Sequence, residues 1–362
     1  MNLTDILLEA FIVVIAVVSL LSNLLVLLCF SQSAEVRAQV PGIFILNLSF
    51  SNILTSILNM PATFLGLATK DSPFGHYFCR AVSFVDTFLT TNAMLSMAAL
   101  SIDRWIAVVF PLTYASKMRF RDALVIVVYS WLQSLAFSLS ALLMSWGGYS
   151  DTYASCTIYL SGGQSGEAEF AAFAVFTVVF HATSFVLCLC VLCFTYLKVL
   201  RVARFHCKRI DVITVQTLLL LVDIHPSVKQ RCLLEQKRRK QRATKKISIF
   251  IGSYVLCYAP YVITRLTELF PHVRIDRRWG IATKCLSYGK GACDPFVYSL
   301  LRQQYRKVLV NVTHRVLRRD QYPSPGQSTS STFDTDHEGN IPQPIQLGYM
   351  KQVHNFRPTN DK

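Results

Sequence analysis

The sequence predicts an all-α membrane protein, a bundle of seven transmembrane helices followed by a short amphipathic eighth helix. Of its 362 residues 52% are hydrophobic and only 16% are charged, a balance too apolar for an ordinary soluble domain. Apolar runs of about 20 residues, long enough to cross a bilayer, recur along the chain up to residue 301. These runs predict spans at 6–30, 41–68, 78–109, 122–146, 169–200, 245–269 and 279–301.

The chain divides into three segments, and the bundle, 1–301, is the first of them. Residues 302–318 alternate basic and apolar positions at helical spacing, which is typical of a helix lying along the membrane surface. From 319 to 362 the composition shifts to Pro, Ser, Thr, Gly and Gln, which predicts a disordered cytoplasmic tail. Its clustered hydroxyl groups are candidate phosphorylation sites, although an unmodified solvated tail fits the same composition.

Basic residues in the loops predict the orientation in the membrane. Connection 201–246 carries 13 Lys and Arg against 3 Asp and Glu, whereas loop 147–169 has three acids and neither Lys nor Arg. Because cytoplasmic loops are enriched in Lys and Arg, the first should face the cytoplasm and the second the exterior. Loop 271–278 is an exception, since it carries three Arg and yet must face outward. We therefore expect a multi-pass plasma-membrane protein with its N-terminus outside and its C-terminus in the cytoplasm.

The net charge of +15 gathers mostly on the predicted cytoplasmic face. Such a face attracts anionic membrane lipid or an acidic cytoplasmic partner, and nothing in its pattern indicates nucleic acid.

Cys79 and Cys156 are placed differently from the cysteines inside the spans, which pack as small apolar residues. Cys79 begins the third span at its outer end and Cys156 lies in the outer loop after the fourth. The oxidising exterior permits a disulfide between them. Asn2, in Asn-Leu-Thr, is a candidate glycosylation site on the same side, although it lies close to the membrane.

Charged residues inside the spans are functional candidates, because a charge in hydrocarbon is costly. Asp86 and Arg104, both in the third span, are 18 residues apart, which is five turns of an α-helix. They therefore share one helix face and lie about 27 Å apart along its axis. A polar group at each end of one face suits signalling across the membrane and suits a transport path equally well.

Residues 96–114, SMAALSIDRWIAVVFPLTY, resemble the third-helix signature of rhodopsin-like (class A) G-protein-coupled receptors, with Trp105 where the family has tyrosine. The chain is most similar to a small orphan subgroup of that class. The resemblance implies a receptor rather than an enzyme, without a cofactor or bound metal, and it places Cys79 and Cys156 at the family's disulfide positions. Further matches, in chain order, are Ser22-Asn23, LNLSFSN ending at Asn52, Trp131, Tyr196, CYAP at 257–260 and DPFVY at 294–298.

The resemblance also implies coupling to a heterotrimeric G protein at the inner end of the bundle, where spans five and six part from span three. Many receptors hold the arginine equivalent to Arg104 against an acid on span six, but the aligned residue here is Lys240. Like charges would disfavour the closed bundle, so we expect appreciable ligand-independent activity unless other contacts hold the off state. The expected coupling and activation residues are Asp103, Arg104, Trp105, Tyr196, Tyr298 and Lys240.

A second departure from the family concerns spans two and seven, where Asn52 and Asp294 have exchanged the usual residues. A carboxylate still faces an amide, which predicts a hydrogen bond between these spans. Asn52 and Ala93 replace two ligands of the family's sodium ion, and Lys290 lies one turn before Asp294 on the same helix face. We expect Lys290 to replace the sodium ion and to pair with Asp294; the alternative is that it reaches water or another acid. With Asn23, these residues form a candidate internal polar switch.

Asp86 aligns with the carboxylate that binds the ammonium of ligands in amine receptors, and Tyr288 aligns with its usual hydrogen-bond partner. One hypothesis is therefore an amine site. The other is that Lys284 or Arg265, both predicted near the outer mouth, neutralises Asp86 internally. The residues of the candidate ligand pocket are Asp86, His181, Ser184, Tyr258, Tyr261, Lys284 and Tyr288.

The expected partners are a heterotrimeric G protein, with the stimulatory, cyclic AMP-raising form implied by the subgroup, membrane lipid, and receptor kinases and arrestin through the Ser/Thr-rich tail. The sequence does not identify a ligand. A transporter would show pseudo-symmetric halves and broken helices near the midplane, and the sequence has neither feature. A receptor-like protein that acts mainly by pairing with another receptor is a further alternative, although it would not need Arg104.

Overall fold

The computed structural model describes residues 3–69, 75–160, 166–220, 248–270, 272–297, 307–308 and 310–311. Of the predicted surface helix 302–318, only residues 307–308 and 310–311 are described, and all four are helical. The predicted tail 319–362 and the candidate residues Asn2, Lys240 and Tyr298 lie outside the described part of the chain.

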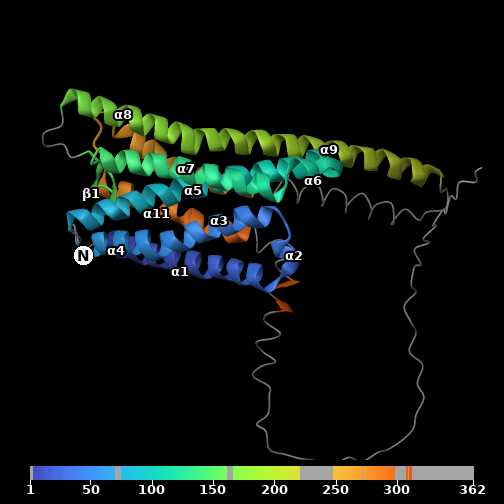
Figure 1. Cartoon of the computed structure of the whole chain (residues 1–362), viewed down its shortest axis with the longest axis horizontal. Helices are drawn as coiled ribbons and strands as arrows, with labels where there is room; N and C mark the ends of the chain where they lie inside the picture. The colour runs from blue at the N-terminus through green and yellow to red at the C-terminus, as the bar shows by residue number, and fades with distance from the viewer. Residues whose placement is uncertain are drawn as a thin grey trace, which may run out of the picture. The chain divides into compact units, whose positions relative to one another are not determined.

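Long helices lie side by side along one direction (Figure 1). The first three spans are α1 (Leu3–Gln32), the continuous run α3 (Pro41–Leu54), η1 (Thr55–Asn59) and α4 (Met60–Thr69), and α5 (His76–Val109). The next two are α7 (Phe120–Leu143) and the run α8 (Glu167–His181), η3 (Ala182–Val186) and α9 (Leu187–Leu220). The last two are the helix Ser248–Thr267 and α11 (Arg277–Pro295). Short helices α2 (Ala34–Arg37), η2 (Pro111–Thr113) and α6 (Tyr114–Lys117) lie in the connections.

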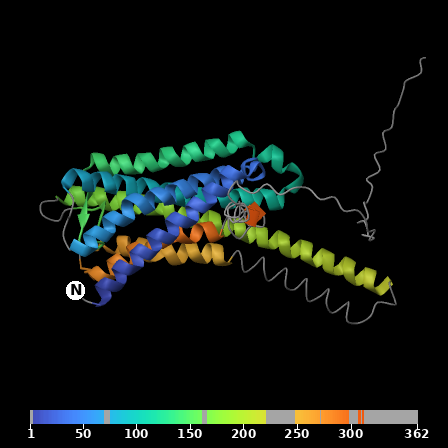
Figure 2. The same ribbon diagram turned by 90° about the horizontal axis from the view of Figure 1, so that it is seen from below.

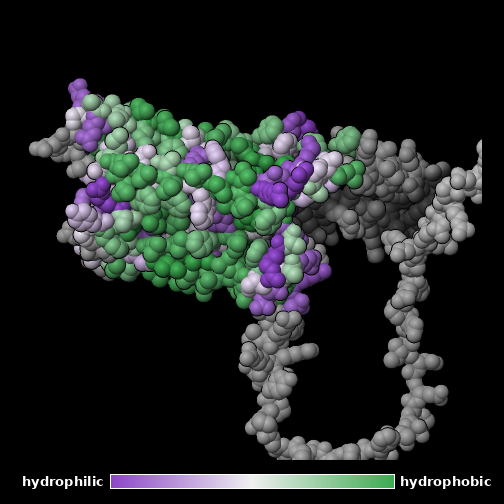
Figure 3. All heavy atoms as spheres, viewed as in Figure 1, coloured by the Kyte–Doolittle hydropathy of each residue, from purple (hydrophilic) through white to green (hydrophobic). Residues whose placement is uncertain are grey.

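Within the described residues, six of these helical runs are long and apolar enough to cross a membrane. The seventh, α11, is more polar because it carries Lys284, Lys290 and Asp294, yet it packs lengthwise against α1 within the bundle. Side chains exposed along the helices are largely aliphatic, and the face in Figure 3 is hydrophobic in its middle with hydrophilic residues towards both ends. An apolar band between polar ends is what a bilayer requires, so the predicted seven-helix membrane fold is confirmed.

α5 is the central helix of the bundle, because it packs against α3, α7 and α9. Its end is set by local sequence: the helix stops at Val109, two residues before Pro111, because proline cannot donate a hydrogen bond and restricts the residue before it. α11 begins where the Asp276 side chain accepts a hydrogen bond from the backbone N–H of Trp279 at 3.2 Å.

α9 continues beyond the predicted span 169–200 and ends at Leu220. No glycine or proline lies between Leu187 and Leu220, so nothing in the local sequence stops the helix. Figure 1 shows α9 projecting beyond the ends of the neighbouring helices, and in Figure 2 the same yellow-green helix extends beyond the other coloured ribbons.

The prediction of an all-α chain missed a β-hairpin between α7 and α8. Strands β1 (Gly147–Ser150) and β2 (Ser155–Ile158) pair antiparallel, with Tyr149 opposite Cys156. Cys156 forms the predicted disulfide with Cys79, with their Cα atoms 5.1 Å apart, so that pairing is confirmed. We call this end of the bundle the hairpin end and the opposite end, near the other terminus of α5, the Arg104 end.

The hairpin turn is wedged against two helices at positions where only glycine fits. A methyl group on Gly66 of α4 would lie 2.5 Å from the carbonyl oxygen of Ala154, and one on Gly280 of α11 would collide with the carbonyl oxygen of Thr152. Ala154 itself has a left-handed φ of 48°, which helps the turn close. The hairpin therefore covers the helix ends above the candidate pocket.

Candidate functional site

Asp86, in α5 towards the hairpin end, is a buried carboxylate whose two oxygens both accept hydrogen bonds from the chain itself. Lys284 Nζ lies 2.6 Å from Oδ2, and the Tyr288 hydroxyl lies 3.1 Å from Oδ1. Asn59 Nδ2 donates to the same Oδ1 at 3.2 Å. A buried carboxylate with a matched cation and two further donors is electrostatically satisfied, which offsets the cost of removing both charges from water.

Of the two cations that the sequence offered for Asp86, the structure brings Lys284 to it. Arg265 instead binds the carboxylate of Glu268 and donates to the carbonyl oxygen of Ile158 at 2.6 Å. Its guanidinium is therefore occupied at the edge of the hairpin. The alternative in which Arg265 neutralises Asp86 is wrong, because its guanidinium binds Glu268 and the carbonyl oxygen of Ile158 in β2 instead.

Asn59 is a partner of Asp86 that the sequence reasoning missed. It ends the π-helical turn η1, whose i→i+5 bonding rotates the following residues relative to a regular α-helix. The available signal was an amide in an apolar span, two turns after Asn52. The direction of the Asn59 side chain, however, depends on the π-helical turn, and the local sequence does not predict that turn.

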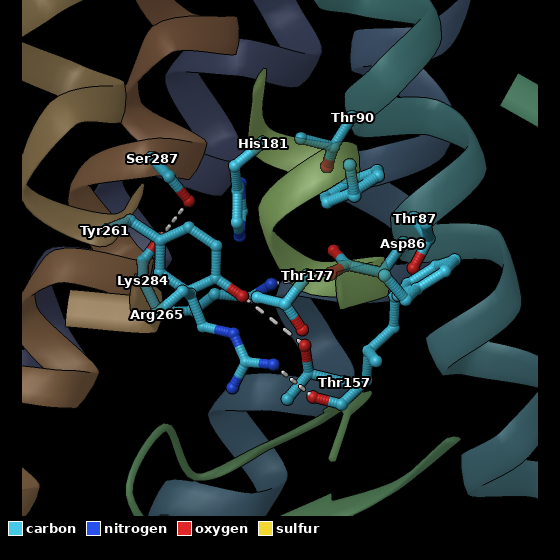
Figure 4. Close-up of a pocket in the computed structure, with 13 residues that line it drawn as sticks. Asp86, Thr87, Thr90, Thr157, Thr177, His181, Tyr261, Arg265, Lys284 and Ser287 are labelled. Carbon is cyan, nitrogen blue, oxygen red and sulfur yellow. Dashed lines mark hydrogen bonds and ion pairs between the residues drawn. The ribbon is translucent and has the colours of Figure 1, made fainter. Parts of the chain in front are cut away.

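A cavity of about 40 Å³ lies beside the Asp86–Lys284 pair (Figure 4). It is wide enough for about one or two water molecules and far below the several hundred Å³ of drug-sized ligand sites. Two buried polar atoms on its wall, Thr177 Oγ1 and His181 Nδ1, have no hydrogen-bond partner among the described residues. The predicted pocket residues that line this cavity are Asp86, His181, Tyr261 and Lys284.

The other three predicted pocket residues lie elsewhere. Tyr258 and Tyr288 line a separate cavity of about 20 Å³, next to Asn52 and Ala93. Ser184 lines neither of these cavities, so its assignment to the pocket is corrected. It belongs to the π-helical turn η3, and its hydroxyl turns back to donate to the carbonyl oxygen of Phe180 at 2.5 Å.

The candidate polar switch forms a connected network between α1, α3 and α11. Lys290, which is fully buried, makes an ion pair with Asp294 one turn later in α11. Asn52 Nδ2 lies 3.2 Å from Oδ2 of Asp294 and 3.3 Å from Oδ1 of Asn23. Asn23 in turn donates to the backbone carbonyl of Gly291 at 3.0 Å. All four predicted members thus lie in one cluster, while the replacement of a sodium ion by Lys290 stays a prediction.

A second buried polar cluster, on α3, α5 and α7, was not predicted as a site. Asn47 Nδ2 donates to Ser96 Oγ at 2.8 Å, and Trp131 Nε1 donates to Asn47 Oδ1 at 2.8 Å. Ser130 adds a hydrogen bond to Asn92 at 2.8 Å. In hydrocarbon such side-chain bonds hold helices together, so this cluster fixes α5 against α3 and α7.

At the Arg104 end, Asp103 is buried and accepts a hydrogen bond from the Tyr114 hydroxyl at 2.7 Å. Burial and this carboxylate raise the pKa of Tyr114 above its ordinary value, so the hydroxyl stays protonated and remains a donor. Arg104 Nε lies 3.7 Å from Oδ2 of Asp103. Asp103 thus ties α5 to α6 and also neutralises the adjacent arginine.

Two aromatic candidates complete this end. The Trp105 ring packs edge-on against Phe110 and Phe194, with centroids 6.1 Å and 6.2 Å away. The buried Tyr196 ring lies 4.5 Å from the Phe250 ring of the helix Ser248–Thr267. Span five is therefore in contact with both span three and span six where coupling was expected.

Comparison of the chain with known proteins identifies its family. Residues 22–298 match the family described as 7 transmembrane receptor (rhodopsin family). The chain is 58% identical over 314 residues to human G-protein coupled receptor 26, covering 87% of this chain and 92% of the relative. It is 49% identical over 328 residues to human G-protein coupled receptor 78, covering 91% and 89%. A more distant relative is the octopamine receptor beta-2R of Chilo suppressalis, 23% identical over 312 residues, covering 82% and 77%.

The predicted resemblance is therefore confirmed, and with it the prediction of a multi-pass membrane receptor that couples to a G protein. The chain belongs to the rhodopsin family of seven-transmembrane receptors.

Proposed function

We propose that this receptor signals without an added ligand, through a stimulatory G protein that raises cyclic AMP. The observation that carries the proposal is the environment of Arg104. Among the described residues, the carboxylate within ion-pair distance of it is Asp103 of its own helix, and no acid reaches it from the helix Ser248–Thr267. A contact within one helix cannot hold two helices together.

The span-six residue aligned with the usual acid is Lys240, whose charge would repel Arg104 in a closed bundle. Removing even about 1.4 kcal/mol of bias towards the off state raises a small active fraction about tenfold. Activation would then consist of spans five and six moving away from α5, so that a helix of the partner enters beside Arg104 and Tyr196. The inner extension of α9 to Leu220 offers that partner an additional surface.

The decisive experiment measures cellular cyclic AMP against surface expression, without added ligand, for the wild type and Arg104→Ala. We expect a rise with expression in the wild type that Arg104→Ala abolishes, because the arginine is the contact for the entering helix. Lys240→Glu, which supplies an acid facing Arg104, should lower the basal signal.

The conservative variant Tyr129→Phe is the matched control, because its side chain faces outward from α7 and is 61% exposed. It should give the wild-type curve. Equal, flat curves for the wild type and Arg104→Ala would contradict this proposal and favour a receptor-like protein that acts by pairing with another receptor.

An amine receptor is the second candidate, favoured by the buried carboxylate of Asp86 beside a cavity and by the similarity to an octopamine receptor. The hydrogen bonds that Asp86 already accepts from three side chains weigh against it. A response of the wild type to a biogenic amine, lost in Asp86→Ala, would support it. Family membership weighs against a transporter.

The remaining expectations are part of the same proposal. With the basic connection 201–246 in the cytoplasm, the hairpin end faces outward and Asn2 is open to glycosylation. The Ser/Thr-rich tail 319–362 would be phosphorylated by receptor kinases and would then bind arrestin, while 302–318 contacts membrane lipid.

A further inference from the structure

The surroundings of the Lys284 ammonium contain the parts of a complete ammonium-binding site. The group lies 2.6 Å from the Asp86 carboxylate and 4.9 Å and 5.0 Å from the ring centroids of Tyr261 and Tyr288. A carboxylate together with aromatic rings is the arrangement that proteins use to recognise organic cations. Asp86 and Tyr261 come from helices other than α11, so the site is assembled by the bundle and does not depend on Lys284 for its shape.

The site lies next to a larger cavity at the hairpin end, with Arg265 in the lining of both. Asp86 and Lys284 both line the cavity of about 40 Å³, as does Arg265 (Figure 4). Arg265 lines in addition a larger cavity of about 480 Å³ between the hairpin, α8 and the end of the helix Ser248–Thr267. Thr177 Oγ1 and His181 Nδ1, which have no hydrogen-bond partner in the described part of the chain, make the wall of the inner cavity polar.

We propose that Lys284 is a built-in ligand: the receptor holds its own primary ammonium in an amine-recognition site, and loss of this side chain makes the site bind a free primary alkylammonium ion. Replacing Lys284 with alanine removes three carbons and the ammonium nitrogen, which together match n-propylammonium. The inference concerns binding and stands without basal activity; only its signalling readout rests on the function proposed above.

The chain supplies a matched control in its other buried lysine pair. Lys290 and Asp294 also form an ion pair and are equally buried, but both groups belong to α11 and Lys290 lines neither of the two cavities. Lys290→Ala should therefore lose stability in the same way without gaining a site that propylammonium can reach.

The experiment is thermal unfolding of the purified full-length receptor in detergent, with n-propylammonium added at constant ionic strength and neutral 1-propanol as the control ligand. We expect Lys284→Ala to melt below the wild type, and propylammonium, at concentrations on the order of millimolar for so small an ion, to raise its melting temperature by about 2 °C or more. The wild type, Lys290→Ala and the double variant Asp86→Asn/Lys284→Ala should not respond, and 1-propanol should stabilise none of them.

An equal shift in the double variant or in the wild type would overturn the inference, as would no shift in Lys284→Ala. If Lys284→Ala is too unstable to purify, its surface expression in cells grown with propylammonium replaces the melting temperature, and absence of recovery there contradicts the proposal. Basal cyclic AMP of the same variants is recorded in parallel. A wild type without basal cyclic AMP would refute the proposed function. The melting temperatures would still show whether Lys284→Ala binds propylammonium.

Discussion

The two buried lysines of α11 show how one residue type is used in two ways by the same helix. Lys284 pairs across the bundle with Asp86 of α5, whereas Lys290 pairs along its own helix with Asp294. A charge left alone in such an interior costs far more than a satisfied pair. The first pair therefore couples two helices. The second keeps the charged Asp294 carboxylate within the bundle, where Asn52 donates a hydrogen bond to it.

Lys290→Ala should lower the free energy of unfolding by about 3–5 kcal/mol, because it leaves the Asp294 carboxylate buried without its cation. The double variant Lys290→Met/Asp294→Asn removes both charges at similar volume and should lose much less. Thermal unfolding of the purified variants measures both. A single variant as stable as the double one would show that Asp294 does not depend on Lys290.

The same pair predicts that sodium has no role in this receptor. Exchanging sodium for choline at constant ionic strength should leave the basal signal and the melting temperature of the wild type unchanged, because the Lys290 ammonium already pairs with Asp294. A clear sodium effect that persists in Lys290→Ala would refute the idea that this lysine replaces the ion.

At the scale of elements, the two π-helical turns decide which side chains meet. In span two, η1 ends at Asn59 and directs that amide to Asp86. In span five, the Tyr254 hydroxyl donates to the carbonyl oxygens of Ser184 and Phe185, both within η3, at 3.5 Å and 3.3 Å. This contact joins spans five and six, the pair expected to move during activation.

Tyr254→Phe should cost about 1 kcal/mol of stability, because it removes the donor while keeping the ring that stacks on Phe185. The melting temperature of the purified receptor measures the loss, with Tyr129→Phe on the exposed face of α7 as the matched control. Equal melting temperatures for the two variants would mean that the hydroxyl does not join the spans.

At the scale of the whole molecule, the hairpin closes one end of the bundle over the candidate pocket. Its turn fits against Gly66 and Gly280, and the Cys79–Cys156 disulfide fixes β2 to the first turn of α5. Arg265 adds a third tie through the carbonyl of Ile158. A ligand entering from this end must therefore pass a cover held at several points, which matches the small volume of the cavity beneath it.

Cys156→Ser should destabilise the receptor by about 2–4 kcal/mol, since it opens the loop closed by residues 77 apart in the sequence. Surface expression and melting temperature should both fall. Cys190→Ser, which removes an exposed free cysteine of α9, is the control and should change neither. Full surface expression of Cys156→Ser would show that the glycine contacts alone hold the hairpin.

The sequence by itself determined the features that depend on local physics. Six of the seven spans follow from apolar runs as long as a bilayer is thick, and the helix ends that lie in the described part of the chain fall within a few residues of prediction except where α9 continues. The contact of Lys290 with Asp294 follows from the period of one helix. The C-terminal end of α5 follows from Pro111, and the N-terminal start of α11 follows from Asp276.

Only the tertiary structure decided the contacts between elements distant in the chain. It selected Lys284 over Arg265 as the partner of Asp86, added Asn59, and turned Ser184 away from the pocket. It also formed a hairpin from loop residues whose strands are four residues each. The physical reason is that these outcomes depend on helix rotation and on distances across the bundle, and a π-helical turn or a disulfide changes both without altering the apolar pattern of any span.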